Sequence, residues 1–262
     1  MMRAAAVALL TMTGAAPALA EAPSGFLDRS VRVGATSYAY KVYVPPGFDA
    51  KKSWPVVLYL HGAGEWGSDG SRQIEVGLGP ALRAHPERFP AVVVFPQAPR
   101  GQVWLGDAAR AATAALDQTI AEFQGDRDRI ALAGISLGAY GSWVLAFEHP
   151  ERYAAIVSVA GGIVPPGGSR ARLTELPPTL QAADPYAATA ARVKDIPAWL
   201  FHGANDPTVP VTESRQLAAA LQKAGAKPRY SEYAGVGHNA WDRAFADPEL
   251  AQWLLAQRRT NR

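Results

Sequence analysis

The chain contains no cysteine among its 262 residues. This absence excludes disulfide bonds, a cysteine nucleophile, thiolate-ligated metal sites and iron–sulfur clusters. A strong charge of one sign is also lacking: the net charge is only +3 and the basic residues are scattered, which argues against nucleic acid as a partner. No apolar run is long enough to span a membrane. The sequence offers no candidate site for a metal or another cofactor, and we expect none.

Residues 1–20 differ in kind from the rest of the chain. Arg3 is their only charge, residues 4–13 form a short apolar stretch, and Ala-Leu-Ala at 18–20 gives a small-x-small cleavage pattern before Glu21. This combination predicts a signal peptide over residues 1–20. We therefore expect an exported protein, periplasmic or extracellular, whose mature form begins at Glu21.

Apolar segments without polar interruption alternate with helical ones along residues 21–262. This alternation is typical of a parallel sheet covered on both faces. We expect an α/β fold with a mostly parallel central sheet, helices on both faces and a single domain. The expected strands are 56–60, 92–95, 130–134, 155–159, 198–201 and 229–233, and the expected helices are 108–124, 137–147, 212–224 and 248–258.

Three further segments complete this organisation. Residues 21–30 are interpreted as a loose lead-in, and the alternating residues 31–44 predict a hairpin or paired strands near a sheet edge. The segment 161–195 is rich in proline and glycine and lies between two expected strands. We interpret it as an insertion that borders a binding site.

Gly134-Ile135-Ser136-Leu137-Gly138 joins an expected strand to an expected helix. A G-x-S-x-G sequence at such a junction is the nucleophile elbow, in which glycines let the chain turn sharply and present the serine hydroxyl. Ser136 is therefore the predicted nucleophile.

A serine nucleophile needs a base, and the base needs a carboxylate to orient it. Asp206 and His238 each follow an expected strand, in the chain order Ser, acid, His that this architecture uses. We predict Asp206 as acid and His238 as base. Asp184 is the main alternative acid, and the other histidines that compete for the role of base are His85, His149 and His202, the last interpreted as a buried scaffold group.

The strand that ends at Leu60 runs into His61-Gly62-Ala63-Gly64. Backbone N–H groups of such a loop can stabilise an oxyanion together with the residue after the nucleophile. We predict Ala63 and Leu137 as the donors of the oxyanion hole, with Gly64 as the alternative to Ala63.

Three tryptophans lie beside these motif loops. Trp66 follows the loop after Leu60, Trp104 follows the loop at the end of another strand, and Trp241 follows His238. Aromatic side chains at a pocket suit rings or sugars, so we predict that all three bind substrate.

These motifs together resemble the α/β-hydrolase superfamily. Within it the chain is similar to secreted esterases and predicted peptidases related to feruloyl esterases, polyhydroxybutyrate depolymerases and the prolyl oligopeptidase catalytic domain. The sequence as it stands carries no amino-terminal propeller, so the resemblance does not imply exclusion of large substrates. It covers about residues 35–258, through Leu60-His61-Gly62-Ala63-Gly64-Glu65, Gly134-Ile135-Ser136-Leu137-Gly138, Phe201-His202-Gly203 with Asp206, Val209-Pro210, and His238-Asn239-Ala240-Trp241-Asp242.

The leading functional hypothesis is a secreted serine carboxylic-ester hydrolase that acts on short-chain or aromatic, feruloyl-like esters. Its partner would be a small-molecule ester, plant-derived or polymer-linked esters included. Two alternatives stay open at this point: a serine peptidase of prolyl oligopeptidase type, and a non-catalytic ligand-binding protein on a hydrolase scaffold.

Overall fold

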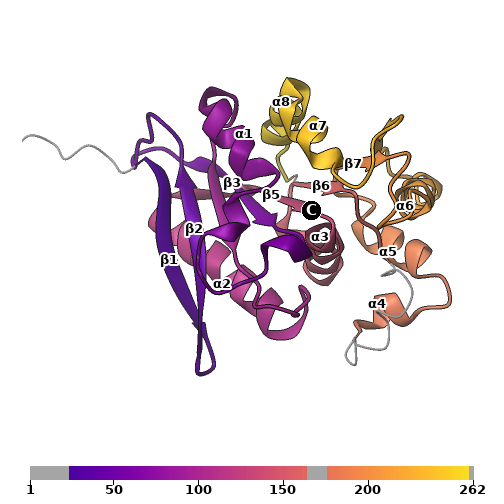
Figure 1. Ribbon diagram of the computed structural model, residues 1–262, viewed down its shortest axis with the longest axis horizontal. Helices are drawn as coiled ribbons and strands as arrows, with labels where there is room; N and C mark the ends of the chain where they lie inside the picture. The colour runs from indigo at the N-terminus through magenta and orange to yellow at the C-terminus, as the bar shows by residue number, and fades with distance from the viewer. Residues whose placement is uncertain (1–23, 164–175, 260–262) are drawn as a thin grey trace, which may run out of the picture.

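The computed structural model describes residues 24–163 and 176–259 (Figure 1). The predicted signal peptide and its cleavage site before Glu21 lie outside these residues, as does the middle of the predicted insertion. The described residues form one α/β domain built on a single eight-stranded sheet.

The strands lie in the order β1-β2-β4-β3-β5-β6-β7-β8. β2 pairs antiparallel with both β1 and β4, and every other neighbouring pair is parallel, which confirms the mostly parallel sheet. The strands are β1 (Gly25–Val33), β2 (Thr36–Val44), β3 (Trp54–Leu60), β4 (Val92–Pro96), β5 (Gly125–Ile135), β6 (Ala155–Val159), β7 (Ala198–Gly203) and β8 (Arg229–Tyr233).

The expected loose lead-in over residues 21–30 is wrong, because β1 begins at Gly25. β1 forms the edge of the sheet, pairs with β2 from Gly25 opposite Val44 to Val33 opposite Thr36, and is mostly half-exposed. An edge strand of this kind lacks the continuous apolar pattern by which the buried strands are recognised. The hairpin predicted over 31–44 is confirmed, with a longer first arm.

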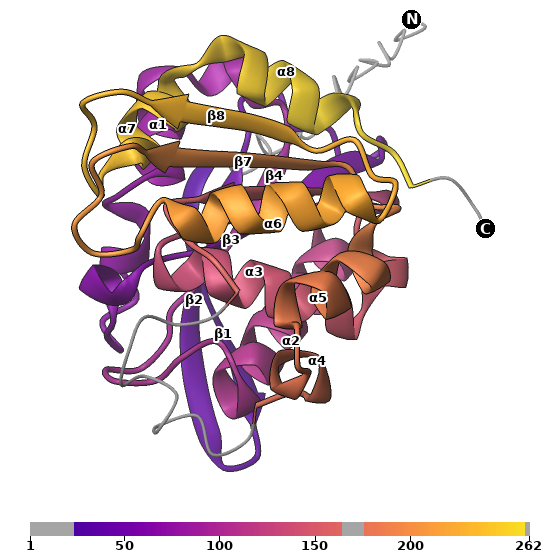
Figure 2. The same ribbon diagram turned by 90° about the vertical axis from the view of Figure 1, so that its right-hand side faces the viewer.

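Helices cover both faces of the sheet, as expected (Figures 1 and 2). One face carries α2 (Gly106–Glu122), α3 (Leu137–Glu148), α5 (Pro185–Val193) and α6 (Thr212–Lys223), whose apolar side chains form one core cluster with the strands. The other face carries α1 (Leu78–Ala84), α7 (Ala240–Ala246) and α8 (Pro248–Ala256), which form the second cluster. The short α4 (Pro178–Gln181) packs against α5.

The prolines of the predicted insertion begin helices in its described part. Pro178 and Pro185 stand at the first position of α4 and α5. Proline suits this position because its missing N–H would have no partner there in any case. The sequence analysis interpreted the proline-rich segment only as an insertion, so it did not predict the two short helices.

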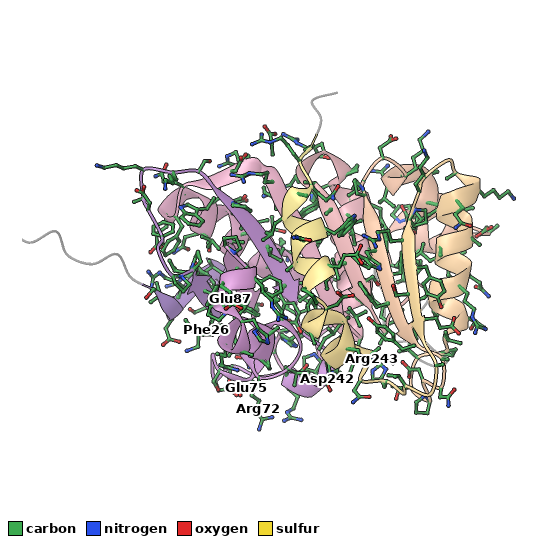
Figure 3. All side chains as sticks on the ribbon, turned by 90° about the horizontal axis from the view of Figure 1, so that it is seen from above. Phe26, Arg72, Glu75, Glu87, Asp242 and Arg243 are labelled. Carbon is green, nitrogen blue, oxygen red and sulfur yellow. The ribbon has the colours of Figure 1, made fainter. Side chains whose placement is uncertain are left out.

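Charged side chains gather at the surface around this core. Figure 3 labels five of them, Arg72, Glu75, Glu87, Asp242 and Arg243, and all five are exposed. Among residues 24–163 and 176–259, no helix is long and apolar enough to cross a membrane.

Candidate active site

Ser136 lies in the turn between the last residue of β5 and the first of α3. Its backbone has φ 49° and ψ −120°, a region that a non-glycine residue occupies only under strain. The N–H of Ser136 donates to the carbonyl of Val159 at 2.9 Å, which ties the turn to β6. This geometry is that of the predicted nucleophile elbow.

The two glycines of the motif are required by close packing. A Cβ at Gly134 would collide with the backbone of Gly138, and a Cβ at Gly138 would collide with the carbonyl of Leu60. The first turn of α3 can therefore approach the ends of β3 and β5 only because both positions lack a side chain.

The structure brings Ser136, His238 and Asp206 into one hydrogen-bonded chain. His238 Nε2 lies 2.9 Å from Ser136 Oγ, and His238 Nδ1 lies 2.7 Å from Asp206 Oδ2. A carboxylate only accepts, so Nδ1 carries the proton and Nε2 is left to accept from the serine hydroxyl. The three groups come from the loops after β5, β7 and β8.

Asp206 is held firmly for this contact. Its side chain has no exposed surface, and its Oδ1 accepts the backbone N–H groups of Thr208 at 2.8 Å and Val209 at 2.9 Å. Asp184, the alternative acid, instead accepts the N–H of Ala187 and caps the start of α5.

The remaining candidate histidines lie elsewhere. His202 is completely buried, as its interpretation as a scaffold group implied. Its Nε2 lies 3.0 Å from the carbonyl of Val209 and 3.3 Å from Asp206 Oδ2. The side chains of His85 and His149 are 45% and 47% exposed at the ends of α1 and α3.

The loop after β3 is fixed by His61, which is fully buried. Its Nε2 accepts the N–H of Ala98 at 3.0 Å, so its Nδ1 carries the proton and donates to the carbonyl of Gly62 at 2.6 Å. Burial lowers the pKa of His61 to about 4, which keeps this arrangement neutral.

This bond sets the direction of the Ala63 amide. In a trans peptide the C=O of Gly62 and the N–H of Ala63 point in opposite directions, so His61 turns that N–H away from its own ring. In the described part of the chain, neither Ala63 N–H nor Leu137 N–H has an assigned protein acceptor. Ala63 and Leu137 line the same cavity as Ser136.

Glu65 holds the same loop from the other side. Its Oε2 accepts the N–H of Gly62 at 3.0 Å, within a single turn of 3-10 helix over Ala63–Glu65. The side chain is half-buried, and burial raises the pKa of its carboxyl group. His61 and Glu65 thus anchor the two peptide groups of Gly62.

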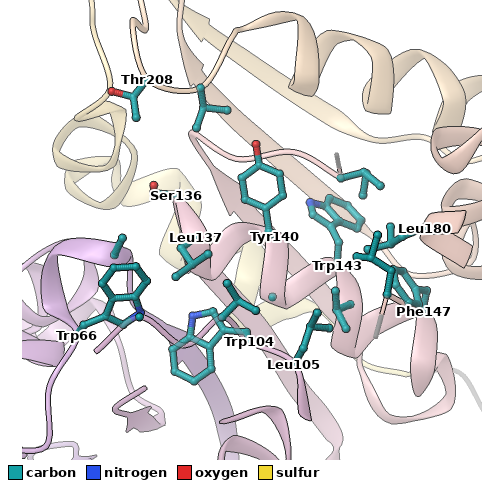
Figure 4. Close-up of a pocket in the computed structure, with 18 residues that line it drawn as sticks. Trp66, Trp104, Leu105, Ser136, Leu137, Tyr140, Trp143, Phe147, Leu180 and Thr208 are labelled. Carbon is teal, nitrogen blue, oxygen red and sulfur yellow. The ribbon is translucent and has the colours of Figure 1, made fainter. Parts of the chain in front are cut away.

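A cavity of about 320 Å³ opens beside Ser136 (Figure 4). Its floor is one face of α3, its far end lies near Phe147 and Leu180, and most of its lining is apolar. The α3 residues that line it are Leu137, Tyr140, Gly141, Trp143, Val144 and Phe147.

Trp66 and Trp104 both line this cavity, where the sequence placed them. The indole N–H of Trp66 donates to the carbonyl of Gln102 at 2.6 Å, and that of Trp104 donates to the carbonyl of His61 at 3.1 Å. Each ring is therefore fixed by its polar edge while its apolar part faces the cavity.

Trp241 departs from the prediction that it lines the pocket with the other two tryptophans. It is not part of the cavity wall. As the second residue of α7, it instead packs against the core cluster on the opposite face of the sheet and meets the ring of His238. The helical turn that follows His238 directs its side chain away from the cavity.

The aromatic residues Tyr140, Trp143 and Phe147 were missed as pocket residues. Their spacing of three and four places them on one helical face, which was the signal available in the sequence. Within residues 24–163 and 176–259, His, Asp and Glu side chains form no group that could hold a metal ion.

The fold and this Ser-His-Asp geometry define an α/β-hydrolase. The model of the Esterase family matches residues 34–255, so the chain belongs to that family.

Solved structures share this fold. A thermostable esterase shares 28% identity with a TM-score of 0.76, over 89% of this chain and 63% of its own, so the chain spans less than two thirds of that protein. A ferulic acid esterase shares 17% identity with a TM-score of 0.69, over 88% of this chain and 97% of its own. The S-formylglutathione hydrolase of Staphylococcus aureus shares 16% identity with a TM-score of 0.64, over 89% and 98%. At their identities, the last two show the fold alone.

Proposed function

We propose that the protein hydrolyses carboxylic esters through an acyl-enzyme on Ser136. The observation that carries this proposal is the continuous chain from Ser136 Oγ through His238 to Asp206, with contacts of 2.9 and 2.7 Å. His238 takes the serine proton as Oγ attacks the ester carbonyl, and then gives it to the departing alcohol. Water, activated by the same imidazole, attacks the acyl-enzyme and releases the acid.

The negative charge that develops on the carbonyl oxygen needs donors already in place. We assign this role to the N–H groups of Ala63 and Leu137. Both residues border the cavity beside Ser136, and His61 fixes the peptide that carries the Ala63 N–H. Asp206 keeps the Nδ1 proton on His238 and stabilises the imidazolium that forms during each step.

For the substrate, we propose short-chain or aromatic, feruloyl-like esters, free or attached to plant-derived material or a polymer. The support is the cavity lining, in which Trp66, Trp104, Tyr140, Trp143 and Phe147 offer several aromatic surfaces. Flat rings suit such surfaces better than flexible chains do.

An ester and amide panel tests this function. We expect p-nitrophenyl acetate, butyrate and feruloyl esters to be hydrolysed with higher kcat/KM than esters of long chains, and peptide p-nitroanilides to be poor substrates. A kcat/KM that keeps rising to sixteen carbons would point to a lipase, and faster cleavage of peptides would point to the peptidase alternative. The Ser136→Ala variant is the control for each substrate.

We also propose that the enzyme acts outside the cytoplasm, on the support of the apolar leader and the Ala-Leu-Ala pattern at 18–20. Amino-terminal sequencing of the exported protein should find Glu21 first. A protein that keeps Met1 after export would contradict this proposal.

A further inference from the structure

Two histidines share one oxygen of Asp206. His238 Nδ1 lies 2.7 Å from Asp206 Oδ2, and His202 Nε2 lies 3.3 Å from the same atom. The side chains of both His202 and Asp206 have no exposed surface, so water cannot replace either contact.

The partners of His202 define where its proton lies. Nε2 faces the carbonyl of Val209 at 3.0 Å and Asp206 Oδ2, and both groups only accept, so Nε2 carries the proton. Nδ1 lies 2.7 Å from Ser214 Oγ and accepts its hydroxyl proton. Burial lowers the pKa of His202, in keeping with a neutral ring that has one proton.

With this proton in place, three N–H groups hydrogen-bond to Asp206 and a fourth lies close to it. Oδ1 accepts from Thr208 and Val209, and Oδ2 accepts from His238. The Nε2–H of His202 donates to the carbonyl of Val209 at 3.0 Å and lies 3.3 Å from Oδ2, where its positive end attracts the carboxylate. The orientation of Asp206 toward His238 therefore rests on two backbone donors and on this polar contact with His202.

We propose that His202 is a positioning residue for the hydrolytic reaction, and that Ser214 holds its ring through Nδ1. Its Nε2–H holds Asp206 Oδ2 in line with His238 and draws part of the carboxylate charge toward itself. This inference rests on the proposed role of Ser136, His238 and Asp206 in ester hydrolysis.

Two other ionisable groups near this network, Tyr140 and Glu232, have shifted pKa values. Burial is the main cause that raises the pKa of Tyr140 far above its usual value. The negative charges of Glu213 and Asp206 raise it further. Glu232 contacts Arg215, which with Tyr230 lowers the pKa of its carboxyl group to about 2. Both pKa values are shifted away from neutral pH, so these two groups do not obscure a comparison of the pH profiles of His202 and Ser214 variants.

The variants His202→Gln and His202→Asn test this role, because both place an amide at the position of the imidazole and differ only in length. In His202→Gln the amide N–H reaches about as far as Nε2 and can still donate to Asp206, whereas in His202→Asn it is one methylene too short. We expect His202→Asn to lower kcat by roughly tenfold or more with KM changed less than about twofold, a smaller loss than the ~10⁴-fold of a disabled acid. His202→Gln should recover most of the activity.

The pH profile separates positioning from support of the fold. Without the second donor, more of the carboxylate charge acts on His238, so the acid limb of kcat/KM should move to higher pH in His202→Asn and stay near the wild-type position in His202→Gln. Ser214→Ala should shift it in the same direction by less. Leu200→Val, a buried change in the same strand, is the control for stability: it should lower Tm and leave the limb unchanged.

The kinetics of the variants show whether His202 positions Asp206. If His202→Asn folds with wild-type kcat and acid limb, the inference is overturned. If it does not fold, Ser214→Ala decides instead, and a wild-type kcat and acid limb in that variant overturn the inference. Failure of the proposed function looks different, because the wild-type enzyme itself would then lack esterase activity and labelling of Ser136 by a fluorophosphonate.

Discussion

The indole of Trp241 meets the imidazole of His238 nearly at a right angle, with ring centroids 5.1 Å apart and planes inclined by 83°. This contact restrains the base without touching the cavity. We therefore expect Trp241→Ala to lower kcat several-fold, because His238 gains freedom to leave its line with Ser136, while KM changes little. Steady-state kinetics on a feruloyl ester measures both constants.

Trp66→Ala is the matched change within the cavity wall. The indole of Trp66 lines the cavity, so its loss should raise KM for aromatic esters more than for p-nitrophenyl acetate and leave kcat largely intact. A rise of KM in Trp241→Ala, together with an unchanged KM in Trp66→Ala, would reverse the two assignments.

Ser136→Ala should abolish hydrolysis, with a loss on the order of 10⁶-fold in kcat. The variant should fold normally, because alanine has the same backbone preferences in the strained elbow and the hydroxyl makes no contact that supports the core. Turnover and a thermal melt of the same preparation test both parts. Residual turnover within tenfold of wild type would reject Ser136 as the nucleophile.

Asp206→Asn should reduce kcat by about 10⁴-fold, because asparagine favours the wrong tautomer of His238. Asp184→Asn is the comparison, since asparagine caps a helix as well as aspartate does and Asp184 only caps α5. It should leave kcat and Tm near wild type. A severe loss at Asp184 with a mild one at Asp206 would mean that the acid is wrongly assigned.

His61 makes stability depend on pH. Its pKa is about 4 in the folded protein against 6.5 in the unfolded chain, so the unfolded state binds more protons between these values and stability falls as pH drops from 6.5 toward 4. The full loss is on the order of 3 kcal/mol for this buried ring. Urea unfolding at pH 4.5 and 7.5 measures it.

His61→Asn, which cannot titrate, should show a shallower fall over that range. The dependence that remains comes partly from His202, whose pKa burial also lowers. An unchanged slope in His61→Asn would mean that His61 is not the titrating group.

Much of the site could be predicted because each of its reactive groups follows an expected strand. Ser136, Asp206 and His238 each lie in the loop after such a strand. The carboxyl ends of parallel strands lie at the same edge of a sheet, so these three residues were expected to lie close together. The contact between His202 and Asp206 could not be predicted, because it depends on how the loop after β7 folds back over its own strand. The sequence interpretation reached only the burial of His202.

Other features could not be predicted, because one helix is too short to give a sequence pattern and the direction of one side chain depends on where that helix begins. α7 is seven residues long, too short for a helical pattern to emerge from Ala240, Ala244 and Phe245. Its second residue, Trp241, lies close to His238 in sequence, yet only the start of that helix decides which way the indole points. β1 carries an edge pattern, half-exposed along most of its length, that resembles a loop.

α3 performs two tasks at once, because its first residue, Leu137, borders the nucleophile and its side forms the floor of the cavity. Near Ser136, substrate specificity and catalytic rate therefore depend on the same part of the helix. A bulkier side chain that tilts the start of α3 would also displace the Leu137 amide. This coupling weakens with distance from Leu137 along α3. Phe147 lies about 15 Å from Leu137 along the helix axis. New specificities, in evolution or in the laboratory, should therefore arise first at that far end, around Phe147 and Leu180, where the enzyme can change what it accepts without changing how it reacts.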